Sequence, residues 1–565
     1  MSNNFVLVAG NDMKRLTSLF AVLVAAQVAS SHAGQKKYVS FGWEYRSLTP
    51  AMILANAEKF KDTAIDGIGV YVNATNSLGR TLKFVTSGEV WEREAFRDQI
   101  DDFRRIAKTP HLTESFFVGF HAPEKRYSWT DDAAWANLEN SMSVLGWLTR
   151  ESGLKGVNCD LEDYHNQRQY ERLPGDPEWD ELVKIVRKRG AQTFGAFFRE
   201  CPDARLLFYY CLNIHSDYFT APDVRALMRR REDLTPAFVD GILDAMPETA
   251  RFIDGCEHSY WSSATRGDFH AMYAKLRTVC PQLLSPENRE KYLRLTQVSF
   301  AIYYDMYVNE KGKSIWYASP IDGSRLEAFR RNLFDATRLA DEYVWFWGEK
   351  NPTIHWENAR IEKRVSNRDV TWSEAVPGLT EAMLCCKDTD WGLERRLKSL
   401  KEKGELVDLC KNSSCEGEGD KIPKPFGEWH RKSDKNVKVF LDQTTGCESA
   451  PSLSIKDGIV KPYGCACILT DAVRGVSAGE TYGIVLNAKG ECSVGAVFAD
   501  ETGVVHSADA VRFVAEKQLK DGWRQMSGVI VVPYGVSSFR VKASIATKYG
   551  ENQFWVDDVH IYKLW

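Results

Sequence analysis

The chain has 565 residues, of which 44% are hydrophobic and 27% charged, and its formal net charge is −4. This is an ordinary globular composition, long enough for two or more domains. The near-neutral charge gives no support to a nucleic-acid-binding protein or one that binds an anionic membrane surface. Aromatic residues make up 12%, with 17 Trp and 22 Tyr. Such a content suits a large core as well as a binding cleft lined with rings.

The N-terminus has the pattern of a secretory signal peptide. Lys14 and Arg15 precede the apolar run "LTSLFAVLVAAQVA", and Ser31-His32-Ala33 supplies small residues for cleavage. We therefore expect residues 1–33 to be removed, the true start to be Met13, and the protein to be secreted or periplasmic. The run is short for a membrane span, so an anchor helix is the less favoured alternative.

The 13 cysteines are expected to be mainly structural. Cys159, Cys211 and Cys256 sit in apolar strand-like runs, where cysteine behaves as a small hydrophobe. No paired C-x-x-C spacing indicates a metal site. Two pairs are candidates for local disulfides: Cys410 with Cys415, and Cys465 with Cys467.

Residues 36–390 alternate short apolar runs with amphipathic helical stretches. The eight runs are "YVSFGWEY", "IDGIGVYV", "FFVGFHA", "GVNCDLEDY", "RLLFYYCLN", "RFIDGCEHSYW", "QVSFAIYYDMY" and "YVWFWGEK". Repeated strand–helix units predict parallel strands with crossover helices, and eight of them predict a (β/α)₈ catalytic barrel. An open doubly wound sheet is the alternative, but no G-x-G-x-x-G follows the first run. One helix start is marked by Ser285, expected as N-cap, followed by Pro286.

The C-terminal part has a different texture. Residues 391–405 read as a helical linker, and residues 406–565 as short alternating strands separated by turn residues. Helical periodicity is absent from this part. We therefore expect a β-sandwich of jelly-roll type.

Polar and aromatic residues collect at the predicted strand ends. In a barrel of parallel strands the active site lies at the C-terminal ends, so these side chains are expected to share one mouth. The candidates are Trp43, Glu44, His121, Asp160, Glu162, Tyr164, Asn213, Glu257, Tyr260, Tyr303, Trp345, Trp347 and Glu349.

The stretch "NCDLEDY" carries the sharpest signal. If the strand continues through it, Asp160 and Glu162 project from one face, about 6.5 Å apart, and Leu161 points away. Two close carboxyls raise one pKa, which suits a general acid. Glycoside hydrolysis needs one protonated carboxyl for the leaving oxygen and one carboxylate as nucleophile or base.

Structural interpretations compete with these functional ones. For Glu44 and Asp305 a structural role is favoured, and Asp254 before Gly255 is expected in a turn. Asp163 is as consistent with a turn as with a site. Tyr260, Trp345 and Trp347 suit either the core or contact with a sugar.

At these residues the chain resembles secreted bacterial glycoside-hydrolase-like barrels with an Asp-Pro-Glu-Pro-Tyr type motif. The resemblance places the motif acids on Asp160 and Glu162, an Asp-Gly-x-Glu element on Glu257 and a Trp-x-x-x-Glu element on Glu349. Leu161 and Asp163 stand where that family has prolines. The resemblance implies hydrolysis of a poly- or oligosaccharide, with Glu162 as general acid/base and Glu257 as nucleophile or base. Asp160 would modulate Glu162, Glu349 would bind substrate or replace Glu257, and no cofactor would be needed.

A looser resemblance is to chitinase-type hydrolases, through "KGVNCDLE". It implies a substrate-assisted mechanism in which Glu162 is the acid, Asp160 steadies the attacking acetamido group, and Tyr303 or Tyr304 holds that group. Lys155 and Asn158 stand where that family has acids.

The C-terminal part resembles carbohydrate-binding jelly rolls, through "LVDLCKNSSCEGEG" and "FWVDDVHIYKL". The resemblance implies a structural Ca²⁺ held by Glu416 and Asp557, and oxygen ligands suit that ion. Trp429 could stack on a sugar or lie in the core.

The sequence therefore predicts an exported glycoside hydrolase whose partner is a carbohydrate. A non-catalytic glycan-binding surface protein is the rival from another class. A sugar lyase or isomerase is disfavoured because no metal cluster or Lys/His base set is evident.

Overall fold

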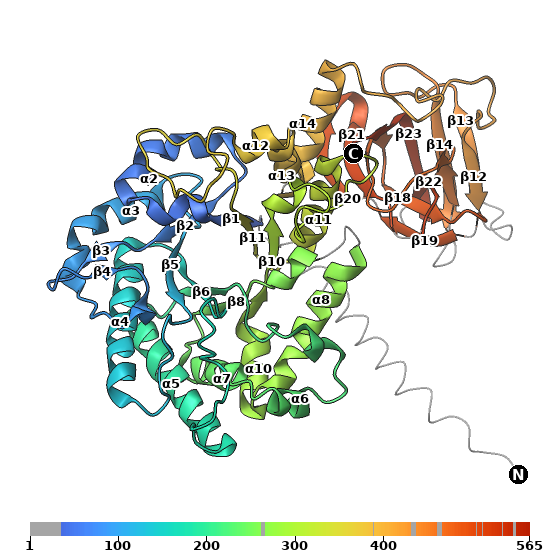
Figure 1. Cartoon of the computed structure of the whole chain (residues 1–565). Coiled ribbons are helices and arrows are strands. Elements are labelled where there is room, and N and C mark those ends of the chain that lie inside the picture. Colours follow the sequence, from blue (N-terminus) through green and yellow to red (C-terminus); the bar gives the residue numbers. More distant parts are fainter. Residues whose placement is uncertain are drawn as a thin grey trace, which may run out of the picture. The chain divides into compact units, whose positions relative to one another are not determined.

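The computed structural model describes residues 36–565 except 262–265, 388, 431–436, 460–465, 504, 511, 534 and 546–549. The chain divides into two compact units, Met1–Thr380 and Glu381–Trp565 (Figure 1). The expected signal peptide, its Met13 start and Cys465 lie outside the described residues. Within the described ranges, no helix combines the length and apolar character that a membrane crossing requires.

The first unit is built on a barrel-like parallel sheet. Its order in the described part is β10-β11-β1-β2-β5-β6-β7-β8-β9, and every neighbouring pair is parallel. The strands are β1 (Lys37–Gly42), β2 (Gly67–Tyr71), β5 (Phe116–His121), β6 (Gly156–Asp160), β7 (Arg205–Phe208), β8 (Arg251–Asp254), β9 (Thr296–Val298), β10 (Phe300–Tyr303) and β11 (Tyr343–Gly348). Only Ser299 separates β9 from β10, so the sheet is nearly closed. All eight predicted runs form strands, the seventh in two pieces.

Helices surround this sheet in Figure 1. They are α2 (Pro50–Asn56), α3 (Ile100–Lys108), α4 (Asp132–Ser152), α5 (Trp179–Glu200), α6 (Val224–Arg230), α7 (Thr235–Ala245), α8 (Arg266–Thr278), α9 (Cys280–Leu283), α10 (Pro286–Leu295), α11 (Arg325–Leu339) and α12 (Trp372–Ala375). The strands are apolar along nearly their whole length because sheet and helices cover both of their faces.

Local sequence signals fix several helix starts. The Asp131 carboxylate accepts the backbone N–H groups of Ala133 and Ala134 at the start of α4. Helix α10 begins at Pro286, as predicted, but the Ser285 side chain does not cap it. Its hydroxyl instead donates to Asp240 at 2.7 Å, so Ser285 ties α10 to α7.

Gly156, at the start of the strand that ends in Asp160, is explained by a close backbone contact. A Cβ atom on Gly156 would lie 1.7 Å from the carbonyl oxygen of Arg205 on the neighbouring strand β7. Only glycine therefore permits this spacing at the start of β6, the strand that ends in Asp160.

Short 3₁₀ turns follow three of the strands and shape their C-terminal ends. These are η1 (Trp43–Ser47) after β1, η6 (Glu257–Trp261) after β8 and η7 (Tyr304–Tyr307) after β10. A small hairpin, β3 (Ala74–Thr75) with β4 (Thr81–Leu82), follows β2. The remaining 3₁₀ turns of this unit are η2 (Ala57–Asp62), η3 (Val85–Ser87), η4 (Arg93–Gln99) and η5 (Ser216–Thr220).

The second unit carries two antiparallel sheets. One has the order β12-β15-β22-β18-β19, with β16 beside β22, and the other β13-β14-β23-β17-β21-β20. The strands are β12 (Gly427–His430), β13 (Val437–Asp442), β14 (Ser452–Ile459), β15 (Ala466–Leu469), β16 (Val473–Arg474), β17 (Thr481–Lys489), β18 (Cys492–Ala499), β19 (Val505–Ala510), β20 (Arg512–Gln518), β21 (Trp523–Val531), β22 (Ser538–Ile545) and β23 (Gly550–Lys563), with the turn η8 (Lys520–Gly522) before β21. One apolar cluster draws on both sheets, including Leu453 and Ile484 from one and Ile468 and Phe539 from the other. The two sheets therefore form a sandwich, as predicted.

Helices α13 (Leu379–Lys387) and α14 (Thr389–Glu402) precede the sandwich. Leu393 and Leu400 of α14 pack with Leu564 from the end of the chain. Residues 406–412, expected to belong to the strand-rich part, contribute only an isolated bridge between Asp408 and Tyr562.

The structure confirms one of the predictions about cysteine and contradicts another. Cys159, Cys211 and Cys256 are buried thiols, as expected. Cys410 and Cys415 are also buried and free, so the expected local disulfide between them is not formed. Their thiols instead point to backbone carbonyl oxygens of Lys411 and Ser413.

Candidate active site

Three carboxyl groups meet at the C-terminal ends of β6 and β8. Asp160 is the last residue of β6, Glu162 follows it by two positions, and Glu257 begins η6 directly beyond β8. Strand β7 lies between them in the sheet. The negative charges of Asp160 and Glu162 both act on Glu257, as expected for neighbouring groups.

Asp160 is 2% exposed, and residues of the loop that follows it donate hydrogen bonds to its carboxylate. Its carboxylate accepts the backbone N–H of Glu162 at 2.9 Å and the Tyr164 hydroxyl at 3.0 Å. Burial raises the pKa of Asp160 to about 7, with the Glu162 charge adding to the effect and these hydrogen bonds opposing it. Asp160 is therefore poised between its neutral and charged forms near neutral pH.

The geometry of this stretch differs from the expected one. Strand β6 ends at Asp160, so Glu162 lies in the following loop and not on a shared strand face. The two acids come together because the Asp160 side chain accepts the backbone N–H of Glu162 and so closes a turn. They are not brought together by the two-residue repeat of a strand. Asp163 closes the next turn by accepting the N–H groups of His165, Gln167 and Arg168, which is a structural role.

Glu257 is the least satisfied acid of the group. Its Oε2 atom is buried without a hydrogen-bond partner among the described residues. Burial, followed by the charges of Asp160 and Glu162, raises its pKa well above the usual range. A neutral carboxylic acid in this position can donate a proton.

A strained turn presents Glu257. Cys256 adopts a left-handed backbone with φ 45°, which is uncommon for a residue with a side chain. Asp254, fully buried, accepts the Cys256 N–H at 3.1 Å and the Asn213 amide at 2.6 Å. Burial raises the pKa of Asp254 to about 7. Asp254 thus fixes the turn, as expected. Asn213, buried after β7, stabilises the same turn by donating to Asp254.

Gly255, inside the same turn, allows the Trp345 ring to approach the backbone closely. A Cβ there would lie 2.7 Å from Nε1 of Trp345, which donates to the Gly255 carbonyl oxygen at 2.8 Å. Trp345 is fully buried and stacks on Tyr209 with ring centroids 4.3 Å apart. Its ring therefore packs against the turn that precedes Glu257. Tyr260 packs on Trp345 and Tyr303, and the buried hydroxyls of Tyr209 and Tyr260 have no hydrogen-bond partner within the described residues.

Glu349 lies beyond the end of β11 and is tied to a second group. It accepts the Trp347 indole N–H at 3.0 Å and shares a hydrogen bond with Tyr303. Its backbone N–H donates at 2.9 Å to the buried Asp305, whose pKa burial raises to about 7. The charges of both Glu349 and Glu257 act on Tyr303, so it lies near both acids. Tyr304 is buried and stacks on the rings of Phe346 and Trp372.

The predicted residues after β1 and β5 have other surroundings. Glu44 is 3% exposed, and its carboxylate accepts the backbone N–H and hydroxyl of Thr353 and the indole N–H of Trp356. Trp43 carries the Arg364 guanidinium over its ring at 5.5 Å. The His121 ring lies 4.1 Å from Phe84, and burial lowers its pKa to about 3, so it is neutral at physiological pH.

Sequence reasoning did not single out three residues of this mouth. Tyr209 and Tyr210 follow β7 directly, and both feel the Glu257 charge, so the strand-end rule could have found them. Trp316 comes from the loop between η7 and α11 and contacts Tyr260 and Tyr303 edge-on at 5.8 and 5.6 Å. No local pattern marks it in the sequence.

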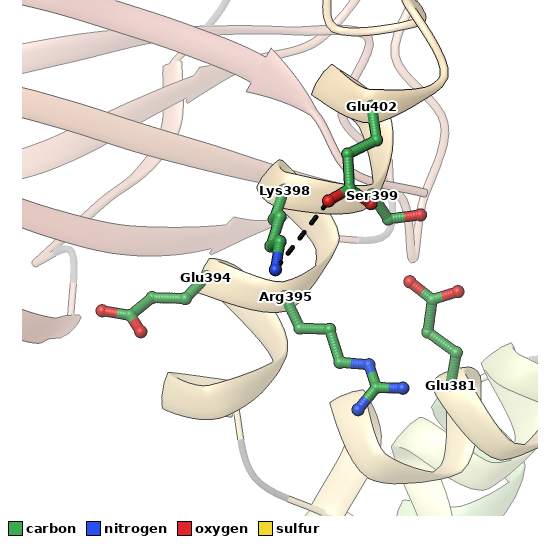
Figure 2. A pocket seen from close by; sticks show the side chains of 6 residues that line it. All are labelled: Glu381, Glu394, Arg395, Lys398, Ser399 and Glu402. Carbon is green, nitrogen blue, oxygen red and sulfur yellow. Dashed lines mark ion pairs between the residues drawn. The ribbon is translucent and has the colours of Figure 1, made fainter.

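A separate hollow of about 550 Å³ lies within the second unit (Figure 2). Glu381 of α13 lines it together with Glu394, Arg395, Lys398, Ser399 and Glu402 of α14, and Lys398 pairs with Glu402 at 3.8 Å. Figure 2 shows charged side chains and one serine, with no aromatic ring. This surface has the character of a solvated helix face and not of a sugar-binding cleft.

The two expected Ca²⁺ ligands lie close enough for their charges to interact. Asp557 is buried, and burial together with the charges of Asp558 and Glu416 raises its pKa to about 6. Its two oxygens accept the N–H groups of Cys447 and Asp558. Among the described residues no group of three His, Cys, Asp or Glu side chains gathers there or elsewhere. Hydrogen bonds thus already occupy Asp557.

No protein-family profile and no curated protein matches the chain. Among solved structures, it is similar to the enzymatically active domain of bacteriophage CBA120 tailspike protein 4, at 12% identity and TM-score 0.19 over 24% of this chain and 19% of that one. The CBM22-1–GH10 modules of Clostridium thermocellum xylanase 10B, complexed with xylohexaose, give 14% identity and TM-score 0.19 over 24% of this chain and 26% of that one. The chain thus spans about a fifth to a quarter of the length of these two proteins.

A longer alignment is found with active domain 2 of the thermostable chitinase from Pyrococcus furiosus. It covers 62% of this chain and 95% of that one, at 12% identity and TM-score 0.34. Likenesses of this size carry no conclusion about activity, which has to be argued from the chain's own residues.

Proposed function

We propose that the protein is an exported glycoside hydrolase that cleaves O-glycosidic bonds of a poly- or oligosaccharide. The main observation is the group formed by Asp160, Glu162 and Glu257 at one end of a parallel sheet, in which Glu257 has a raised pKa and a buried Oε2 atom without a hydrogen-bond partner among the described residues. In this proposal the sheet is a closed (β/α)₈ barrel in which β9 and β10 are halves of the seventh strand. Active sites of such barrels lie at the C-terminal strand ends.

The environments of the two glutamates suggest their roles. Both side chains are half-buried, but the Oε2 atom of Glu257 is fully buried, and burial together with the charges of Asp160 and Glu162 raises the pKa of Glu257 well above its usual range. We therefore assign Glu257 as the acid that protonates the leaving oxygen as its bond to the anomeric carbon breaks. Glu162 is then the carboxylate that attacks that carbon or removes a proton from the attacking water. This reverses the roles expected from the sequence.

Asp160 and Glu349 complete the proposed site. Asp160 sits at hydrogen-bonding distance from Tyr164 and the Glu162 backbone, so it fixes the loop that carries Glu162. Glu349, with Trp347 and Tyr303, would bind substrate hydroxyls. The rings of Tyr209 and Tyr260 flank the acids and exclude water, which strengthens their electrostatic interactions.

A substrate-assisted reaction is the second candidate. Its support is Asp160, which with a pKa near 7 can accept a hydrogen bond from, or donate one to, a substrate amide beside Glu162. In that case Glu162 is the acid, and hydrolysis is confined to 2-acetamido sugars. The sandwich unit would serve as a carbohydrate-binding module in either case, with Ca²⁺ at Glu416 and Asp557 still a prediction.

The experiment is hydrolysis of a panel of polysaccharides and aryl glycosides by the wild type, Glu162→Gln and Glu257→Gln. Glu257→Gln should lose activity mainly on substrates with a poor leaving group, because an activated aryl leaving group needs no proton. Glu162→Gln should lose activity on both kinds, and azide should restore it as a glycosyl azide.

Other outcomes revise or remove the proposal. The opposite pattern exchanges the two roles, and activity on acetamido sugars alone without azide rescue favours the substrate-assisted reaction. If the wild type releases sugar from no member of the panel, or if both variants keep full activity on a proven substrate, the proposal is wrong.

A further inference from the structure

A row of aromatic rings leads outward from the neighbourhood of Glu257. Tyr260 and Tyr303, 5% and 7% exposed, lie beside each other with centroids 5.1 Å apart. Trp316 meets both of them edge-on. Trp261 lies against Trp316, with centroids 4.1 Å apart and planes inclined by 31°. The row thus passes from the barrel interior to solvent.

The outer end of this row exposes apolar surface. Trp261 is 52% exposed, although one side of its ring is covered by Trp316. Ile315, next to Trp316, is 76% exposed. An indole this exposed contributes little to the core, and exposed apolar surface beside polar groups is typical of a binding site.

The loop that carries Trp316 is fixed by polar contacts. The Asn309 side-chain amide donates to the Trp316 carbonyl oxygen at 2.6 Å, and the Trp316 N–H donates to the Ser314 hydroxyl at 3.0 Å. Lys350, which follows Glu349, donates to Asn309. The indole pair is therefore held in place before any ligand arrives, which reduces the entropic cost of binding.

We propose that Trp261 and Trp316 form a platform for a further sugar ring of the same glycan chain whose scissile bond lies at Glu162 and Glu257. The enzyme would therefore act on a saccharide chain and not on a single glycosyl unit. This inference rests on the proposed function and names its substrate more closely.

The spacing supports a sugar as the occupant. Glu257 and Trp261 are the first and last residues of η6, and four 3₁₀ steps separate them by about 8 Å along the axis. That distance is comparable with the reach of a disaccharide. The C–H face of a pyranose is flat and apolar enough to cover an indole, while its hydroxyls remain in water at the rim.

The test uses cello- and chito-oligosaccharides from the disaccharide to the hexasaccharide, with the matching aryl monoglycosides. Binding is measured by calorimetry and hydrolysis by product release, for the wild type, Trp261→Ala, Trp261→Tyr and Trp429→Ala. Trp429 is the matched control because it is 51% exposed but lies on β12 of the sandwich.

Trp261→Ala should weaken binding and kcat/KM for the longer saccharides about tenfold, in line with the loss of one ring contact. It should leave the aryl monoglycosides unchanged, and Trp261→Tyr should restore most of the loss. Trp429→Ala should match the wild type on soluble substrates.

The possible failures are distinct. Length-dependent binding that needs Trp261, without any hydrolysis, upholds the platform and removes the proposed function. Hydrolysis that is equal for short and long substrates, or losses in Trp261→Ala that do not depend on length, overturn the platform and leave the hydrolase. Absence of both binding and hydrolysis overturns both proposals.

Discussion

Glu44 and Glu257 are two glutamates that follow strands of the same sheet, the first buried and the second half-buried, and they differ in their hydrogen bonding. Burial raises the pKa of Glu44 to about 7 and that of Glu257 well above its usual range. Glu44, however, accepts hydrogen bonds from the backbone and hydroxyl of Thr353 and from Trp356. Glu257 leaves Oε2 without a partner in the part of the chain that the structure describes.

The difference separates a structural acid from a reactive one. A carboxyl with all its partners inside the fold holds loops together, because removing it leaves buried donors unsatisfied. A carboxyl with a buried oxygen that lacks a partner costs stability and is retained where a ligand supplies the missing contact. Burial alone therefore does not identify the catalytic group. The unused oxygen of Glu257 stands out because it lies beside two further acids, Asp160 and Glu162, at the end of the sheet.

The largest expected effect comes from Glu257→Gln. Hydrolysis of a substrate with a poor leaving group should fall about 10²–10⁴-fold, the usual contribution of a general acid. The melting temperature should stay the same or rise, since the substitution removes an ionisable group with a buried oxygen that lacks a partner among the described residues. Steady-state kinetics and thermal unfolding monitored by circular dichroism check both. A loss of stability with little change in activity per folded molecule would place Glu257 with Glu44.

The pH dependence of stability gives the next effect. Asp254 is protonated in the folded protein up to about pH 7 but ionises at about pH 4 when unfolded. The folded state then binds more protons between these values, so this contribution to stability is complete below about pH 4 and is lost as pH rises to about 7. The shift corresponds to up to about 4 kcal/mol.

Urea unfolding of the wild type and Asp254→Asn between pH 4.5 and pH 8 measures this contribution. The stability difference between wild type and variant should fall steadily with rising pH. A difference that is independent of pH would show that Asp254 is already ionised in the fold, like an ordinary surface carboxyl.

Glu44→Gln is the matched counterpart of Glu257→Gln. The amide cannot accept all the hydrogen bonds that the carboxylate accepts, so the free energy of unfolding should fall by about 1–3 kcal/mol. Activity per folded molecule should change little. A loss of kcat above tenfold with unchanged stability would mean that Glu44 acts on the substrate.

The smallest effect is expected for Tyr164→Phe. It removes the hydroxyl that donates to Asp160 at 3.0 Å, so the charged form of Asp160 loses support and its pKa should rise. We expect a loss in kcat/KM of about threefold to thirtyfold, and a pH–rate profile displaced to higher pH. An unchanged profile would show that Asp160 does not control the reaction.

Much of the first unit was predictable because buried parallel strands and amphipathic helices leave strong patterns. All eight strand runs and the acids that follow β6 and β8 could be found in this way. The relation between Asp160 and Glu162 could not, because it depends on where β6 ends and on a hydrogen bond between side chain and backbone. Nor could the satisfied state of Glu44, since Thr353 and Trp356 are about 300 residues away in sequence. Trp316 lies in a loop whose path only the fold defines.

The protonation of Glu257 tests the account most directly. Infrared difference spectra between the wild type and Glu257→Gln at neutral pH would show the carbonyl stretch of a protonated carboxyl if Glu257 is the proposed acid, with no such band in a comparison with Glu162→Gln. This band should persist at pH 7 and disappear as the pH is raised further. Carboxylate bands alone at pH 7 would show that Glu257 is ionised, and would contradict its role as the proton donor.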